Sequence, residues 1–133
     1  MNLWYLDTSA LAKLVRPEPE TPALRRWLGR RSWILSDLHR VELRRAATRA
    51  GGRAPARADR LLAESDVISV TAEVFDAAGR LAPPGLRSLD ALHLAAAMSL
   101  GDDLGGLVTY DARQADAARD CGLTVAAPAG RAE

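Results

Sequence analysis

Short apolar runs alternate with helix-like segments along this chain. Strands are predicted at residues 3–6, 33–36, 66–70, 107–110 and 123–126, where short, β-prone apolar runs occur. Helices are predicted between them, at residues 8–15, 21–29, 37–50, 55–64, 71–81, 88–100 and 112–121. This alternating order predicts an α/β fold with three layers, in which helices cover both faces of a mainly parallel sheet.

Length and composition favour one domain. The 133 residues, 48% of them hydrophobic, suffice for a single core. We expect residues 1–127 to form the domain and residues 128–133 to be a frayed tail. No apolar run approaches the roughly 18 residues of a membrane span and no secretory signal precedes the first strand, so we expect a cytoplasmic protein. The lone Cys121 cannot form an internal disulfide and fits a reducing compartment.

Four acids stand out by their local settings. Asp7 and Asp111 directly follow apolar runs, and the carboxyl ends of parallel strands meet at one edge of a sheet. Glu42 and Asp90 lie in helical patterns that could face the same edge. Four converging carboxylates repel one another unless a cation joins them. The pattern therefore predicts a metal site formed by Asp7, Glu42, Asp90 and Asp111.

Each acid also has a structural alternative. Asp7 and Asp111 could cap the helices that follow them. Glu42 could pair with an arginine on its own helix surface. Asp90 could favour the dipole of a helix that Ser88 caps.

Two histidines and a fifth acid remain outside this set. His93 follows Asp90 by three residues and shares its helical face, a spacing that suits two ligands of one metal. Its apolar neighbours favour instead a histidine satisfied in the core or at an interface, and the same holds for His39. Asp116 is more typical of an exposed helix position.

The net charge of +1 conceals an uneven distribution. Residues 16–60 hold twelve arginines against five acids, whereas residues 61–133 hold five arginines against eleven acids. Guanidinium groups bind phosphate in a bidentate fashion, so an arginine-rich half beside metal-binding acids favours a phosphodiester substrate. Ordinary solvated helix faces are the alternative for many of these arginines.

Four segments resemble, in order, the motifs of PIN-domain proteins, in particular the VapC-type toxin ribonucleases of bacterial type II toxin-antitoxin pairs. They are residues 6–11, 41–43, 89–95 and 109–113. The resemblance implies that Asp7, Glu42, Asp90 and Asp111 take the four acidic active-site positions and that Thr109 supplies a neighbouring hydroxyl. It also implies Mg²⁺ or Mn²⁺ as cofactor, RNA as substrate, a homodimer, and a small VapB-like antitoxin as partner.

The chemistry of phosphodiester cleavage agrees with this hypothesis. A divalent cation screens the phosphate charge and lowers the pKa of the attacking water. We expect Asp7, with Asp90 or Asp111, to bind the metal most directly, and Glu42 to orient or deprotonate that water. Flanking phosphates would be held by Arg40, Arg44 or Arg45.

Two other functions remain open at this point. The first alternative is a haloacid-dehalogenase-like phosphatase, which also places an Asp after its first strand. Such an enzyme needs a second Asp two residues later, where this chain has Ser9. It also needs a lysine later in the chain, whereas the only lysine here is Lys13. The second alternative is a non-catalytic module that binds nucleic acid or a partner, in which the acids are caps and surface charges.

Overall fold

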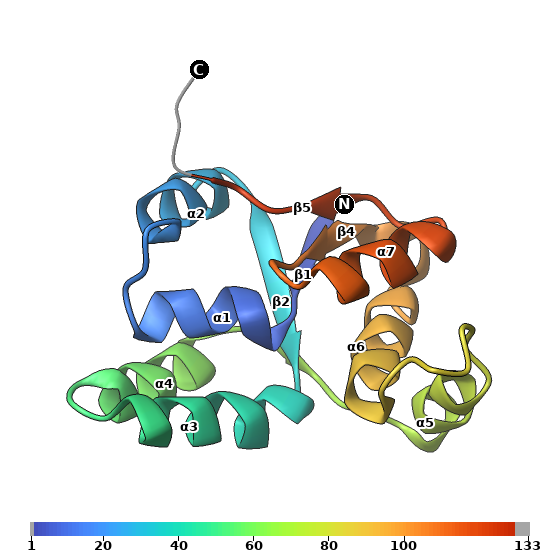
Figure 1. The fold of residues 1–133 in the computed structure, drawn as a ribbon, viewed down its shortest axis with the longest axis horizontal. Helices are drawn as coiled ribbons and strands as arrows, with labels where there is room; N and C mark the ends of the chain where they lie inside the picture. The colour runs from blue at the N-terminus through green and yellow to red at the C-terminus, as the bar shows by residue number, and fades with distance from the viewer. Residues whose placement is uncertain (1, 130–133) are drawn as a thin grey trace.

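A parallel sheet forms the centre of the molecule in the computed structural model, which describes residues 2–129 (Figure 1). The strand order is β3-β2-β1-β4-β5, and every neighbouring pair is parallel. The strands are β1 Leu3–Leu6, β2 Ser32–Ser36, β3 Val67–Ile68, β4 Leu104–Val108 and β5 Val125–Ala126.

Helices cover both faces of this sheet. They are α1 Thr8–Val15, α2 Thr21–Leu28, α3 Leu38–Ala50, α4 Ala54–Glu64, α5 Ala72–Gly79, α6 Ser88–Met98 and α7 Ala112–Asp120. Figure 1 shows α1 to α4 on one side of the strands and α5 to α7 on the other. The predicted three-layer α/β fold is confirmed.

Each face of the sheet has its own apolar core, because successive strand side chains point to opposite faces. Leu6 of β1 packs with residues of α1 to α4, and its neighbour Tyr5 packs with residues of α5 to α7. Val108 and Leu107 of β4 divide in the same way. Successive residues of one strand therefore contribute to different cores.

The chain reverses its direction across the sheet between β1 and β4. After β1 it proceeds to β2 and β3 on one side, then returns to place β4 and β5 on the other side of β1. In parallel α/β sheets, ligands bind beyond the carboxyl ends of the strands at such a reversal. Asp7 follows β1 and Thr109 follows β4, so both lie at this point of the fold.

Strand β4 differs from the prediction of residues 107–110. It begins at Leu104 and ends at Val108, so Gly105 and Gly106 lie within it and Thr109 lies beyond it. A Cβ on Gly106 would stand 2.6 Å from the Trp4 ring and 2.5 Å from the carbonyl oxygen of Thr124. Both glycines of β4 leave room for the ring of Trp4, which packs directly against the backbone of this strand.

Other boundaries need smaller corrections. The predicted strands at 66–70 and 123–126 each contain only two strand residues. The predicted Ser88 cap is wrong, because Arg87 takes the N-cap position of α6 and Ser88 is its first helical residue. The helix predicted at residues 37–50 begins one residue later, at Leu38, and the Asp37 carboxylate pairs with Arg40 at 3.1 Å without capping the helix.

Two further expectations concern a frayed C-terminal tail and the lack of a membrane-spanning segment. The carbonyl oxygen of Pro128 accepts a 2.6 Å hydrogen bond from the Tyr110 hydroxyl. Most of the expected frayed tail, residues 130–133, lies outside the described residues. No helix within residues 2–129 is long and apolar enough to cross a membrane.

Candidate active site

Asp7 is a buried carboxylate at the carboxyl end of β1. Its Oδ1 caps α1 by accepting the Ala10 N–H at 3.1 Å, and it also accepts the Ser9 hydroxyl at 2.6 Å. Its Oδ2 accepts a hydrogen bond from the Thr109 hydroxyl. The side chain is almost inaccessible to water, and this burial raises the pKa of Asp7 even though the three hydrogen bonds lower it. The predicted helix cap is confirmed, and all three donors are neutral.

Asp111 repeats this arrangement after β4. Its Oδ1 caps α7 by accepting the N–H groups of Arg113 at 2.9 Å and Gln114 at 3.5 Å. The Asp111 N–H donates to the Thr109 hydroxyl oxygen at 3.1 Å. Thr109 therefore connects the two aspartates, since it donates to Asp7 and accepts from Asp111.

Asp90 lies in the first turn of α6, and Arg87 joins it to Asp111. The Arg87 Nε donates to Asp90 Oδ2 at 3.2 Å, and a terminal guanidinium nitrogen of the same residue lies 3.6 Å from Asp111 Oδ2. The Gln114 side-chain amide also donates to the Asp90 carbonyl oxygen at 3.1 Å, which holds α7 against α6. The Arg87 side chain is 66% exposed, so it can move away from both acids.

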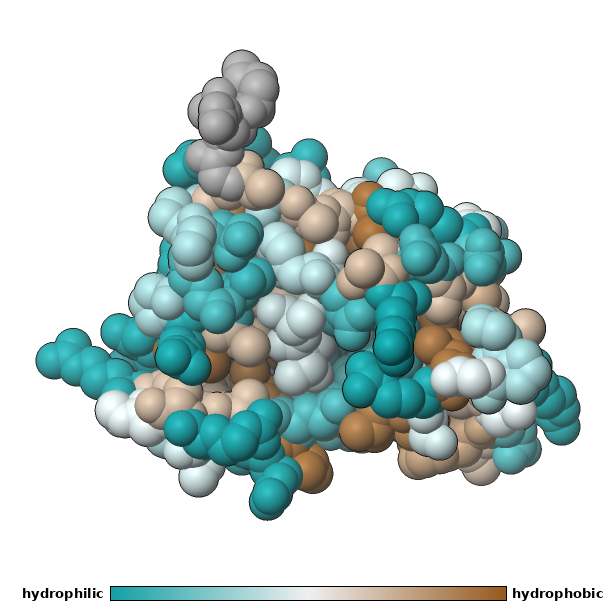
Figure 2. Space-filling view, in the orientation of Figure 1, coloured by the Kyte–Doolittle hydropathy of each residue, from teal (hydrophilic) through white to brown (hydrophobic). Residues whose placement is uncertain are grey.

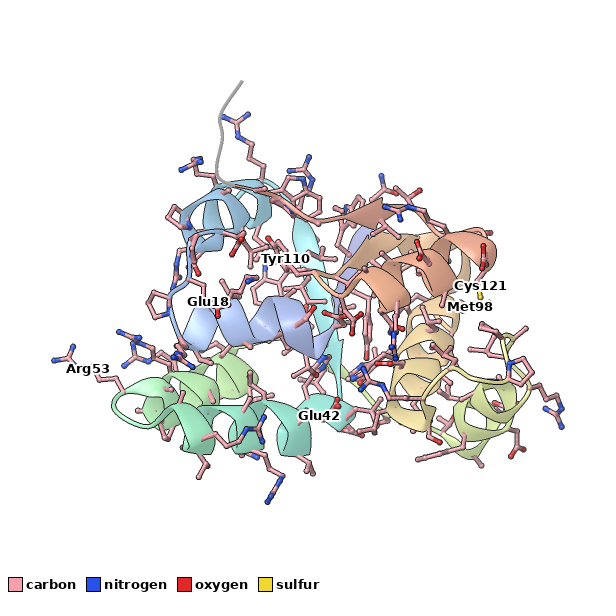
Figure 3. All side chains as sticks on the ribbon, in the orientation of Figure 1. Glu18, Glu42, Arg53, Met98, Tyr110 and Cys121 are labelled. Carbon is pink, nitrogen blue, oxygen red and sulfur yellow. The ribbon has the colours of Figure 1, made fainter. Side chains whose placement is uncertain are left out.

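Glu42 projects from α3 toward α1 and α6; its residue is labelled in Figure 3. Its Oε1 accepts a hydrogen bond from the Thr8 hydroxyl at 3.0 Å and another from Nε2 of His93. Partial burial opposes ionisation, but the hydrogen bonds that Glu42 accepts from His93 and Thr8 hold the pKa of Glu42 below its usual value. The partner of Glu42 is therefore a histidine of α6, and the expected arginine partner is not observed in the described part of the chain.

The three arginines predicted near Glu42 lie on the outer surface of α3 or at its start. Arg40 pairs with Asp37, and Arg44 pairs with Asp59 at 3.1 Å. Both side chains are about half exposed. Arg87, which the sequence did not single out, is the arginine in contact with the candidate acids.

Hydrophilic residues share the middle of this face with residues of intermediate hydropathy (Figure 2). Figure 2 shows them between the α1 to α4 layer and the α5 to α7 layer, with apolar atoms below them. Tyr110, labelled above α1 in Figure 3, carries Lys13 over its ring at 4.7 Å. Lys13 of α1 therefore lies against the residue that directly precedes Asp111.

The donor atoms fit a hard divalent cation, because carboxylate oxygens are the ligands that Mg²⁺ prefers. Among residues 2–129, however, no three His, Cys, Asp or Glu side chains are already placed to hold a metal ion. In this structure Arg87 contacts the carboxylates of Asp90 and Asp111, and His93 contacts that of Glu42. That the four acids bind one ion therefore stays a prediction, and it requires Arg87 to turn outward.

Comparison with known proteins identifies the family. A PIN domain family model matches residues 4–120. The chain is 49% identical over 125 residues to ribonuclease VapC46 of Mycobacterium tuberculosis, a match that covers 93% of this chain and 96% of that protein. It is 43% identical over 130 residues to ribonuclease VapC47 of the same species, again covering 93% of this chain and 96% of the relative.

A solved structure agrees in fold. VapC20 of Mycobacterium tuberculosis, described as a sarcin-ricin loop cleaving toxin, matches with a TM-score of 0.73 at 19% identity, over 94% of this chain and 99% of that one. The chain therefore belongs to the PIN-domain family. Within that family it is a VapC-type ribonuclease, as the resemblance of its four motifs predicted. This assignment replaces the phosphatase and the non-catalytic alternatives.

Proposed function

We propose that this protein is the toxin of a toxin-antitoxin pair and hydrolyses RNA phosphodiester bonds with Mg²⁺, or with Mn²⁺ in its place. The observation that carries the proposal is the setting of Asp7. This carboxylate is buried, has only neutral donors, and lies where the sheet topology favours a ligand. A buried acid with a perturbed pKa is typical of a functional site, since a structural cap would serve equally well as Asn or Ser.

The metal would be held most directly by Asp7 and by Asp90 or Asp111, and Glu42 would bind it through a water molecule. When bound, it would screen the phosphodiester charge and supply a water of lowered pKa. Ser9 and Thr109 fix the orientation of the Asp7 carboxylate, because they donate to different oxygens of it. Thr109 thereby acts on the site through Asp7 and Asp111.

Glu42 would act on the attacking water. Thr8 and His93 both donate to Oε1, so Oε2 is the oxygen through which Glu42 would orient the water or accept its proton. Arg87 would exchange Asp90 and Asp111 for a substrate phosphate, to which its guanidinium can donate two hydrogen bonds. Arg40, Arg44 and Arg45 would contact phosphates farther along the RNA.

The proposed partner is a small VapB-like antitoxin. A groove of about 500 Å³ between α1, α2 and α4 has an apolar floor that includes Leu14 and Trp33, and arginines line it. Such a surface suits an acidic segment with apolar side chains. The arginines are Arg25, Arg57 and Arg60. We further propose a cytoplasmic homodimer, for which the exposed Phe75 and Met98 offer apolar surface.

The nuclease proposal is tested with purified protein and a mixed RNA pool. Wild-type protein should cleave RNA with Mg²⁺, and EDTA, Asp7→Asn or Asp90→Asn should each abolish cleavage. Asp116→Asn is the matched control, because Asp116 is an exposed acid of α7 that pairs with Arg119 at 3.7 Å. Cleavage that persists in EDTA and in both active-site variants would reject the proposal.

A further inference from the structure

A chain of buried polar side chains lies directly behind Glu42. His93 and Tyr5 are at most 2% exposed, and the Tyr5 hydroxyl lies 2.7 Å from His93 Nδ1. The same hydroxyl lies 2.7 Å from the Ser36 hydroxyl at the end of β2. At the other end of this series of hydrogen bonds, Nε2 of His93 is bonded to Oε1 of Glu42. The series therefore connects β2, β1 and α6 to a candidate active-site carboxylate on α3.

The hydrogen-bonding capacities of these groups set the direction of the chain. A carboxylate only accepts, so Nε2 of His93 carries the proton that it shares with Glu42. In a neutral ring, Nδ1 then accepts, and the Tyr5 hydroxyl must donate to it. The Tyr5 oxygen is left to accept from the Ser36 hydroxyl, whose oxygen in turn accepts the Leu38 N–H at 3.3 Å. Each group thus determines the role of the next one.

We propose that His93 is a positioning residue that holds the Glu42 carboxylate toward the metal and RNA site, with Tyr5 selecting the ring tautomer that makes this possible. The inference rests on the proposed function, because it assigns His93 a role at the same site. A histidine that orients a carboxylate need not contact the metal or the RNA. Partners of this kind, one shell behind the ligands, typically change metal affinity by 10- to 100-fold when they are removed.

His39 provides the matched control. Its ring lies beside that of His93, with centroids 4.8 Å apart, and it is equally buried. Burial lowers the pKa of His39 to about 3, so this ring stays neutral. Its Nδ1 accepts the backbone N–H of Ser36 at 3.1 Å, so its hydrogen bonding is to the backbone and not to a carboxylate. Loss of His39 therefore disturbs the same core without removing a donor to a carboxylate.

The first measurement needs no metal. In wild-type protein, ¹⁵N shifts of the histidine rings should identify His93 as protonated at Nε2 and unprotonated at Nδ1. Tyr5→Phe removes the hydroxyl that selects this tautomer, and Glu42→Gln removes the acceptor. Either variant should change the His93 signals, whereas His39→Leu should leave that tautomer in place. A His93 ring protonated at Nδ1 in the wild type would overturn the proposed direction of the chain.

The second measurement is Mn²⁺ affinity, obtained from the EPR signal of free Mn²⁺. His93→Leu should weaken Mn²⁺ binding by about 10-fold. His93→Gln keeps a side-chain N–H donor and should recover most of that loss, and His39→Leu should retain wild-type affinity. In the Glu42→Gln background, His93→Leu should have no further effect, because the two residues act as one unit.

The outcomes separate the two proposals. If wild-type protein binds Mn²⁺ in an Asp7-dependent way but His93→Leu or Tyr5→Phe binds it equally well, the positioning role of His93 is rejected and the nuclease proposal stands. Additive effects of His93→Leu and Glu42→Gln also reject that role. If Asp7→Asn does not alter Mn²⁺ affinity, the proposed metal function itself fails.

Discussion

Asp7→Asn should make the metal-free protein more stable while it abolishes RNA cleavage. The asparagine oxygen can still accept from Ser9 and from the Ala10 N–H, so the cap of α1 is retained. Its amide can donate to the Thr109 oxygen, in place of the hydrogen bond that Thr109 now donates. The substitution therefore removes a buried charge and keeps the local geometry.

The sign of the effect follows from the pKa of Asp7. Burial raises this pKa in the folded protein above its value in the unfolded chain. Between the two pKa values the folded protein binds more protons, so its stability falls as the pH rises through that window. Each unit of upward shift corresponds to about 1.4 kcal/mol lost at neutral pH. For a chain of this length, each 1 kcal/mol recovered by Asn raises the Tm by about 4 °C.

The assay is thermal unfolding of both proteins in EDTA from pH 4 to pH 8. The variant should have the higher Tm at pH 8, and the difference should shrink as the pH falls toward 4, because the approach to the ordinary pKa of Asp, about 3.9, begins to neutralise the carboxylate in the unfolded chain as well. Mg²⁺ should then raise the Tm of the wild type and leave that of the variant unchanged. A variant that is less stable at every pH would refute the argument that Asp7 is a destabilising, functional charge.

Three other substitutions test separate contacts. Arg87→Gln removes partly exposed ion pairs with Asp90 and Asp111, worth about 0.2–1 kcal/mol for each of the two contacts, so Mn²⁺ affinity should rise by about 2- to 30-fold. Weaker binding in an EPR titration would contradict this. Thr109→Val leaves a buried Asp7 oxygen without its donor, so chemical denaturation should give about 1–3 kcal/mol less stability, accompanied by loss of cleavage. Gly106→Ala places a Cβ 2.6 Å from the Trp4 ring and should lower the free energy of unfolding by about 1–3 kcal/mol, with a shift in tryptophan fluorescence. An unchanged denaturation midpoint would refute the packing argument.

The sequence predicted the layers of the fold and most helices because apolar periodicity and caps are local signals. For example, Thr71 caps the start of α5 and Pro55 lies in the first turn of α4, close to where the sequence predicted these helices to begin. The start of β4 was missed because Gly105 and Gly106 are poor strand residues in isolation. Glycine is required at position 106 because of long-range packing, since a Cβ there would meet both the Trp4 ring and the carbonyl oxygen of Thr124.

The sequence indicated the candidate acids but not the groups that contact them. Asp7 and Asp111 follow strands, and this placement is visible in the sequence. Glu42 and His93 are 51 positions apart on different helices, so no local pattern indicates that they are hydrogen bonded. The apolar neighbours of His93 favoured a histidine satisfied within the core, and the ring is indeed buried and hydrogen bonded, but its partners Glu42 and Tyr5 could not be named from the sequence.

The most direct test of the central claim is the position of Mn²⁺ in a crystal of the wild-type protein, located by anomalous scattering. The account predicts a peak in coordination contact with Asp7 and at least one of Asp90 and Asp111, with Arg87 turned away from them. A peak bound elsewhere, with Arg87 still joining Asp90 and Asp111, would contradict it.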